Sequence, residues 1–279
     1  MTVKNIIVPV LFMGAATFAQ TKKEVTLKPV YKPETTYRQT ALQKHSNTIR
    51  YKGDPDVLQV LKEQGVQNPT EQVTNIDFIT ETKTGKSLDG TQIPLTLTVV
   101  KLPEAFSKKG FTQGVKAYGI ADADGHARLD SVTAPEVDKK LKANLLDILE
   151  TAMKPAKFPD KPFKQGQTQQ ITTTASIPLP GHTVEMDVVS AYTLTEIKKG
   201  IALFDIVITY KLKQPDPNFR IVAEGNGKGT MSYDIKNNFP LQQQSTTITH
   251  IDFSYKQFDI EMNANLHYEN TATVTPDAK

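Results

Sequence analysis

The feature that most constrains this sequence is a strict alternation of apolar and polar residues in its second half. Three runs show it, each roughly ten residues long, whereas an ordinary strand has about five or six. Successive side chains of a strand point to opposite faces, so each run is predicted to be a half-buried antiparallel strand. The apolar positions are Val184, Met186, Val188, Tyr192 and Leu194; Phe204, Ile206, Ile208, Tyr210 and Leu212; and Phe258, Ile260, Met262, Ala264, Leu266 and Tyr268.

Strands of this length twist and coil, so a sheet built from them is expected to curve. A helix with a wide apolar stripe would fill the concave side. We therefore expect an α+β fold that is mostly β, in which one main helix packs on a large curved antiparallel sheet, half-barrel or barrel-like in shape.

That main helix is predicted over residues 134–154. Thr133 and Glu136 have the spacing of a capping box, and Lys154-Pro155 ends the segment. Apolar residues recur inside it at helical spacing, which predicts one buried face. These residues are Val137, Leu141, Leu145, Ile148 and Ala152, with Leu146, Leu149 and Met153 beside them.

The first half predicts shorter elements. A helix is expected between Asp54 and Gly65, because Pro55 suits a first helical turn and glycine suits a helix end. Residues 73–101 are rich in β-branched residues and predict two strands joined near Gly85 and Gly90, with Ile93, Leu95, Leu97 and Val99 on one face. Residues 115–120 and 127–132 flank Asp124-Gly125, a dipeptide that favours a tight hairpin.

The N-terminus is typical of a signal peptide. Lys4 precedes an apolar run from Ile6 to Ala16, which is shorter than the roughly twenty residues of a membrane-spanning helix, and small residues lead to Ala19. We expect cleavage after Ala19 and no transmembrane segment in the mature chain. Residues 20–36 contain Pro29 and Pro33 and predict a poorly ordered leader. Residues 37–275 would form a single domain, with a proline-rich connector at 155–162.

The chain contains no cysteine. A lipid-modified N-terminal cysteine, disulfides and thiolate chemistry are therefore excluded. The predicted location is periplasmic or extracellular, in soluble form and not as a lipoprotein. Loss of residues 1–19 removes only Lys4, so 32 basic and 30 acidic residues leave a net charge of +2. Such a mixed balance gives no footprint for nucleic acid or for an anionic membrane surface.

Two glycine-containing segments invite a ligand interpretation. Asp122-Ala-Asp124-Gly125 resembles the start of a calcium loop, but the glycine comes too early and no glutamate closes the ligand shell, so a hairpin turn is predicted instead. Gly225-Asn-Gly227-Lys-Gly229 resembles a phosphate loop, but a strand-like alternation follows it instead of a helix. A glycine-rich turn or bulge within a hairpin is the prediction there.

No catalytic or metal motif is found. The five histidines, His45, His126, His182, His250 and His267, share no local face, and His250 is expected near the level of Met262. Nucleophile elbows, zinc-protease helices and Walker loops are missing from the sequence. Asp187 and Asp205 are one candidate carboxylate pair across strands. We therefore predict no cofactor and no enzymatic activity.

The run from Gln242 to His250 is polar on both strand faces. Two interpretations fit it: an edge strand whose polarity prevents aggregation, which is favoured, or a strand that lines a wet groove.

Several weak motifs carry a family resemblance: Tyr37, Asp124-Gly125, Gly225-x-Gly227 and Asp234. With them, the chain from about residue 37 to 274 resembles exported proteins of Gram-negative envelopes that have no assigned function. The resemblance implies export and a similar β architecture, and it implies no activity. A looser likeness, of architecture only, is to periplasmic lipoprotein carriers, in which a curved sheet encloses an apolar cavity.

Three functions follow from these patterns. The leading prediction is a non-catalytic exported binding protein for a lipid, another apolar ligand or the apolar segment of a partner. The second is an envelope assembly factor that docks a protein partner along an edge strand such as 242–250. The third and weakest is an enzyme with dispersed carboxylates. The predicted ligand-lining residues are Tyr192, Phe204, Tyr210, Phe258, Met262 and Tyr268.

Overall fold

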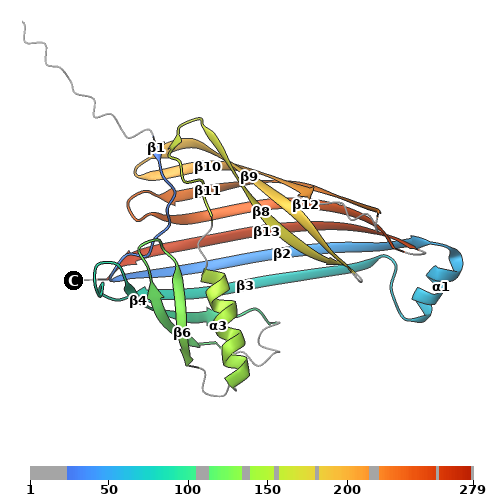
Figure 1. Cartoon of the computed structure of the whole chain (residues 1–279), viewed down its shortest axis with the longest axis horizontal. Helices are drawn as coiled ribbons and strands as arrows, with labels where there is room; N and C mark the ends of the chain where they lie inside the picture. Colours follow the sequence, from blue (N-terminus) through green and yellow to red (C-terminus); the bar gives the residue numbers. More distant parts are fainter. Residues whose placement is uncertain are drawn as a thin grey trace, which may run out of the picture.

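The structure is a computed structural model, and it describes residues 24–104, 113–133, 139–153, 157–179, 182–213, 220–255 and 258–277. Its centre is one antiparallel sheet of eleven strands, in the order β6-β5-β4-β3-β2-β13-β12-β11-β10-β9-β8 (Figure 1). The sheet is not closed, so β6 and β8 are its two edges. The predicted signal peptide lies outside the described residues.

The strands of this sheet have the lengths that the alternation predicted. β2 and β13 pair antiparallel along all nineteen residues of each strand, a ladder of about 60 Å, and thereby join the two halves of the chain. The bounds are β2 Thr35–Gly53, β3 Thr70–Thr84, β4 Ile93–Lys101, β5 Lys116–Ala121, β6 Ala127–Thr133, β8 Thr168–Leu179, β9 His182–Lys198, β10 Ile201–Leu212, β11 Arg220–Asp234, β12 Phe239–Tyr255 and β13 Phe258–Pro276.

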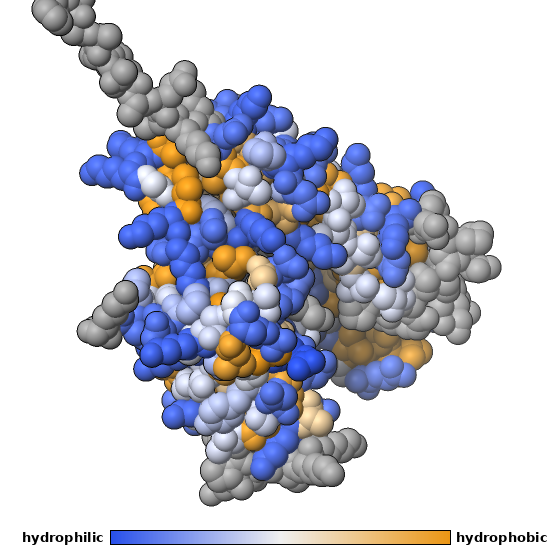
Figure 2. Space-filling model, turned by 60° about the vertical axis from the view of Figure 1, so that its left-hand side comes forward, coloured by the Kyte–Doolittle hydropathy of each residue, from blue (hydrophilic) through white to orange (hydrophobic). Residues whose placement is uncertain are grey.

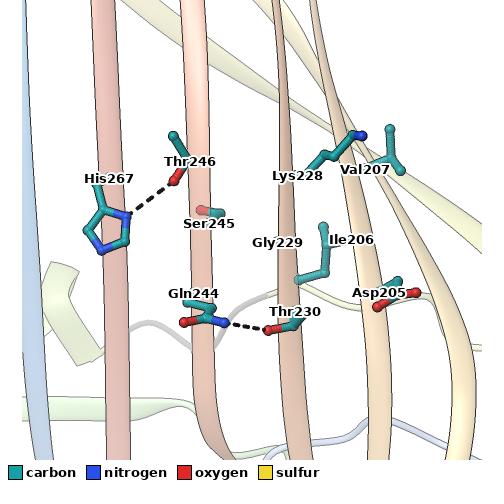
Figure 3. Close-up of a pocket in the computed structure, with 10 residues that line it drawn as sticks. All are labelled: Asp205, Ile206, Val207, Lys228, Gly229, Thr230, Gln244, Ser245, Thr246 and His267. Atoms are coloured by element: carbon teal, nitrogen blue, oxygen red, sulfur yellow. Dashed lines mark hydrogen bonds between the residues drawn. The ribbon is translucent and has the colours of Figure 1, made fainter.

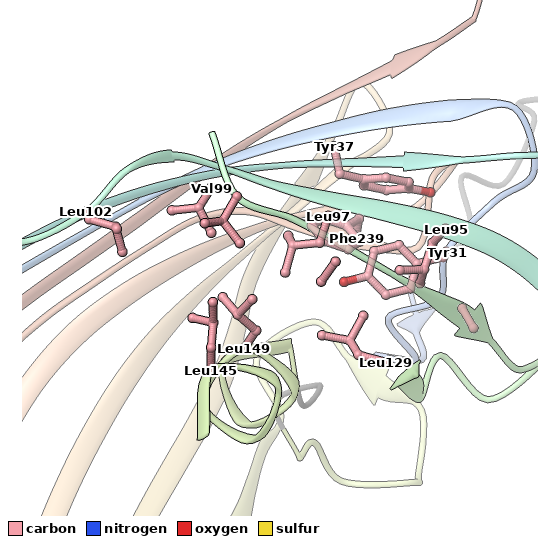
Figure 4. Close-up of a cluster of buried hydrophobic side chains, with 13 residues drawn as sticks. Tyr31, Tyr37, Leu95, Leu97, Val99, Leu102, Leu129, Leu145, Leu149 and Phe239 are labelled. Carbon is pink, nitrogen blue, oxygen red and sulfur yellow. The ribbon is translucent and has the colours of Figure 1, made fainter. Parts of the chain in front are cut away.

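The two predicted helices are present. α1 (Pro55–Glu63) begins after Asp54, whose side chain makes no capping hydrogen bond, and Gly65 follows it with a positive φ of 77°. α3 (Lys139–Met153) lies on the concave side of the sheet, which arches over it (Figure 4). Thr133 ends β6, and the rest of the predicted capping box lies outside the described residues.

The buried face of α3 is rotated from the predicted one. Leu145 and Leu149 are buried against Leu97 and Val99, whereas Ile148 is 38% exposed (Figure 4). Residues 145 and 149 are one turn apart and so share a face, and residue 148 lies about 100° away from 149. Leu146 and Met153, also predicted for the apolar side, pack against the same cluster, and the side chains of Val137, Leu141 and Ala152 lie outside the described residues. We call the surrounding buried group, with Tyr31, Tyr37 and Phe239, the α3 cluster.

The N-terminal segment differs from the poorly ordered leader that the sequence predicted. From Glu24 onward it packs on the concave side, where β1 (Glu24–Val25) pairs with β7 (Phe163–Lys164). Leu27 and Tyr31 are buried, and the Tyr31 ring meets that of Tyr37 edge to face at 5.1 Å (Figure 4). The backbone N–H of Lys32 donates to the Tyr37 hydroxyl at 2.6 Å. Pro29 and Pro33 are compatible with this packing, because the apolar side chains of Leu27 and Tyr31 are buried in the clusters of the sheet.

The β5–β6 hairpin holds this segment in place. Gly125 has a φ of 84°, and a Cβ built on it would lie 2.2 Å from the Pro29 carbonyl oxygen. Lys28 and Asp124 form an ion pair at 2.8 Å beside this contact. Asp122 Oδ1 accepts hydrogen bonds from the backbone N–H groups of Asp124 and His126, which confirms the hairpin turn. Around this end of the molecule, hydrophobic residues form separate patches between hydrophilic ones (Figure 2).

Replacing Gly125 with alanine should destabilise the protein by about 2 kcal/mol. The new Cβ would clash with the Pro29 carbonyl oxygen, and alanine is strained at a positive φ. The matched control is Gly90→Ala, since Gly90 has a φ of 83° with nothing near its missing Cβ. The control should lose about 1 kcal/mol. Equal losses for the two variants in urea unfolding would show that the N-terminal segment is not packed on the hairpin.

Candidate functional site

The two faces of the sheet differ completely in charge. We call the face that contacts α3, β1 and β7 the inner face. Within the described strands β2, β3 and β8 to β13, alternation and register place every Asp, Glu, Lys and Arg on the opposite, outer face. These residues are Arg38, Lys44, Arg50, Lys52, Glu71, Asp77, Glu81, Lys83, Glu185, Asp187, Glu196, Lys198, Asp205, Lys211, Arg220, Glu224, Lys228, Asp234, Asp252, Asp259, Glu261 and Glu269.

Apolar clusters occupy the two ends of the inner face. Beside the α3 cluster lies a β7 cluster, in which Phe163 packs edge to face on Phe204 at 5.1 Å. At the end from which β2 leads into α1 lies a distal cluster, built by Val184, Met186, Ala223, Ile251 and Met262. The distal cluster extends across the neighbouring strands β9 to β13, and Tyr210 and Leu212 of β10 pack against it.

Between these clusters lies a stretch of the inner face that belongs to none of them. We call it the midsection. Most of its side chains are half-buried, and in the described part of the chain no helix packs on it. It consists of Gly225, Gly227 and Gly229 on β11, Ser245, Thr247 and Thr249 on β12, Ala264, Leu266 and Tyr268 on β13, and Gln43, His45 and Asn47 on β2.

The glycines of the midsection correct the predicted turn or bulge. They lie in the middle of β11, paired without interruption to β12. A Cβ on Gly227 would lie 2.4 Å from Thr247 Cγ2, and one on Gly229 would lie 2.3 Å from the Gln244 carbonyl oxygen. A side chain therefore has no room there, and the two strands approach more closely than ordinary residues allow. Glycine permits turns, bulges and close approach alike, so the sequence pattern did not distinguish them.

Two inner-face tyrosines, Tyr192 on β9 and Tyr268 on β13, have perturbed hydroxyl groups. Burial, with a smaller contribution from Tyr268, raises the pKa of Tyr192 to about 12. Burial likewise raises the pKa of Tyr268. Three strands separate β9 from β13 in the sheet, and the pairings place the two tyrosines at the same level of the inner face. Both phenols stay neutral at physiological pH in a weakly polar environment.

The five predicted lining residues whose side chains are described belong to the inner face but divide among three environments. Tyr192 and Phe204 are buried in the β7 cluster, where Phe158 covers the Tyr192 ring at 5.6 Å. Met262 is buried in the distal cluster, and Tyr210 packs against it. Tyr268 alone lies in the midsection, and the side chain of Phe258 lies outside the described residues.

Sequence reasoning missed the polar part of the midsection. Gln43, His45 and Asn47 occupy three successive inner positions of β2. Asn47 Oδ1 is buried and has no hydrogen-bond partner in the described part of the chain. The signal was present, because Lys44 between them marks the outer face and leaves three uncharged polar residues on the other. The prediction of ligand-lining residues relied instead on the long apolar runs of the second half.

The run 242–250 is not an edge strand, which corrects the favoured interpretation. It forms part of β12, which pairs with β11 on one side and β13 on the other. Its outer side chains instead line a polar depression of about 580 Å³, which supports the other interpretation (Figure 3). There Gln244 donates to Thr230 Oγ1 at 3.1 Å, and Thr246 Oγ1 lies 3.2 Å from His267 Nδ1 (Figure 3). A partner strand therefore cannot pair with this run, because both of its backbone edges are already paired.

The candidate carboxylate pair is also separated. Asp187 pairs with Lys211 and Asp205 pairs with Thr193, so the two carboxylates lie six residues apart along the ladder, about 20 Å. His250 pairs with Asn263, next to Met262, as predicted. Among the described residues, no three histidine or acidic side chains are grouped to hold a metal ion.

Comparison with models of known protein families finds no match, and comparison with curated protein sequences finds none either. The resemblance to exported envelope proteins thus stays a prediction. No helix in the described ranges combines the length and the apolar character needed to cross a bilayer.

His250 predicts a pH-dependent contribution to stability. Its Nδ1 lies 2.8 Å from Asn263 Oδ1 and its Nε2 lies 3.1 Å from Asp252 Oδ2, so both nitrogens face acceptors. The hydrogen bond to Asn263, aided by Asp252, raises the pKa of His250 above 6.5. Its contribution is complete below the unfolded-state pKa of about 6.5 and is lost as the pH rises through the higher folded-state value.

His250→Gln should therefore flatten the fall in unfolding free energy between pH 6 and pH 8. His267→Gln serves as the matched control, since His267 Nδ1 lies beside the uncharged Thr246 hydroxyl on the same pair of strands. Urea titrations at several pH values measure both variants. An unchanged slope in His250→Gln would contradict the assignment.

Proposed function

We propose that this protein is a non-catalytic binding protein that holds an apolar ligand, most simply a lipid, against the midsection of its inner face. The observation that carries the proposal is the uncharged inner face, whose half-buried, small-residue midsection lies between two apolar ends. A water-soluble protein ordinarily covers such a surface with its own helix or with a ligand.

The midsection suits an elongated molecule. Gly225, Gly227 and Gly229 form a floor without side chains, and Leu266 and Tyr268 stand beside it. Each methylene group transferred from water to such a surface contributes about 0.8 kcal/mol before the costs of ordering the ligand. An acyl chain lying along the strands would therefore gain enough to bind.

The same surface favours binding over catalysis. Catalytic pairs require a carboxylate, a metal or an activated nucleophile close to the reacting group. The inner residues of β2, β3 and β8 to β13 offer hydroxyls, amides and His45, and the carboxylates of these strands lie on the outer face. Export is part of the proposal, because residues 1–19 have the pattern of a signal peptide, and it places the protein in the periplasm or outside the cell.

Filling the midsection should abolish binding. Ala264→Trp places a bulky ring on the inner face of β13, whereas Asn265→Trp places the same ring on the outer face one residue away. Displacement of a fluorescent apolar probe by unlabelled lipid should show at least a tenfold loss of affinity in Ala264→Trp and less than a twofold change in Asn265→Trp. Organic extracts of the purified wild-type protein should contain lipid by mass spectrometry.

The proposal fails if wild-type protein carries no lipid after purification and its melting temperature does not respond to fatty acids, fatty-acid esters or phospholipids. Equal affinity in the two tryptophan variants would place any binding elsewhere on the molecule.

A further inference from the structure

The polar residues of the midsection carry a narrower inference, which rests on the proposed function. We propose that the ligand is an electrically neutral amphiphile whose hydroxyl or amide group hydrogen-bonds to Gln43, His45 and Asn47 of β2. A monoacylglycerol, a diacylglycerol or a ceramide has this chemistry. We refer to these three residues as the polar row.

The polar row lies at the same level as the glycine floor. In the sheet, Gln43 is opposite Tyr268, His45 is opposite Leu266 and Asn47 is opposite Ala264. On the other side, β3 places Ile76, Thr74 and Gln72 at these three levels. A chain lying between β11 and β13 rests on the small hydroxyl side chains of β12. The longer hydrogen-bonding side chains of the polar row flank it on the β2 side, whereas Ile206 and Ile208 flank it on the β10 side. An amphiphile with one polar end or one polar side matches that division.

Asn47 gives the second observation. Its Oδ1 atom is buried, and the described part of the chain supplies no donor for it. A buried acceptor without a donor destabilises the protein, so a ligand that supplies one gains a hydrogen bond and removes that penalty. Because Asn47 as a whole is only half-buried, rotation of its amide brings either polar atom to the inner surface. A hydroxyl both donates and accepts, so it satisfies either orientation.

The absence of charged side chains from the inner face of these strands favours a ligand with an uncharged head group. A carboxylate or phosphate in the midsection would lie on a face where β2, β3 and β8 to β13 provide no Lys or Arg. Removing such a group from water without a counter-charge is costly, and the same holds for a cationic head group without Asp or Glu. A neutral head group avoids the cost. Fatty acids and phospholipids should accordingly bind less well than neutral lipids with the same chain.

Three probes with one acyl chain separate these contributions: 1-monooleoylglycerol, methyl oleate and oleate at pH 8. By displacement of a fluorescent apolar probe from the full mature protein, monooleoylglycerol should bind at least tenfold more tightly than oleate and several-fold more tightly than methyl oleate. Asn47→Leu keeps the size of the side chain and removes its polar atoms. It should weaken monooleoylglycerol binding about tenfold and change methyl oleate binding less than twofold.

The same variant should raise the melting temperature of the ligand-free protein, because it removes a buried unpaired acceptor. A misfolded variant would show the opposite shift. Asn265→Leu on the outer face is the matched control and should leave all three affinities unchanged.

The outcomes test the neutral head group and the lipid-binding function separately. If oleate binds as tightly as monooleoylglycerol, the neutral head group is wrong while the lipid-binding function stands. The wild-type comparison gives this answer even if Asn47→Leu does not fold. If none of the three probes binds, the proposed function fails and the inference fails with it.

Discussion

The separation of charge between the two faces of the sheet is the constraint on which the rest of the structure depends. In the long strands that carry charge, the charged residues lie on the outer face over as many as nineteen positions, and a register shift in β9 keeps Glu185 and Lys198 on that same face. A shift of one residue in any pairing would place a row of charges on the inner face. Register is therefore fixed along the whole ladder, and cross-strand ion pairs such as Lys52 with Glu261, at 2.7 Å, reinforce it from the outer side.

Curvature follows from the sizes of the inner side chains. Large residues such as Phe204 and Met262 fill the two ends, whereas Gly227, Thr247 and Ala264 occupy the middle. Glycine within a strand often marks a tight bend or a close approach of backbones, and the three glycines of β11 lie in this middle part. Tyr192 and Tyr268 lie at one level of this face, three strands apart. The inner face thus contains a half-buried surface of small residues in addition to the buried hydrophobic clusters.

Much of this fold could be predicted from local patterns, because alternation, turn dipeptides and helix ends are properties of neighbouring residues. The hairpin at Asp124-Gly125 and the inward positions of Ile206 and Ile260 are examples. Strand order could not be predicted in the same way. The run 242–250 is polar on both faces, as edge strands are, but its inner residues are small because they form the floor. The partners that show this come from strands distant in sequence.

The candidate site was predicted in part for the same reason. Large apolar residues mark a face reliably, but the largest of them, such as Phe204, are buried in the clusters. The surface that stays half-buried is built from residues that sequence patterns assign to turns or to solvent, such as Gly227 and Asn47. The half-buried midsection could be told from the buried core only once the pairing of β2 with β13, a contact between the two ends of the chain, was known.

The chain has no cysteine, so a single spin label can be attached at any chosen position. Labels at Ala264 and Asn265 sample the two faces at one level of β13. The account predicts that the label at 264 reports an apolar environment, is reached by oxygen and shielded from a charged chromium complex, and loses mobility when lipid is added, while the label at 265 reports water throughout. Equal polarity and equal access to the charged complex at both positions would contradict the account.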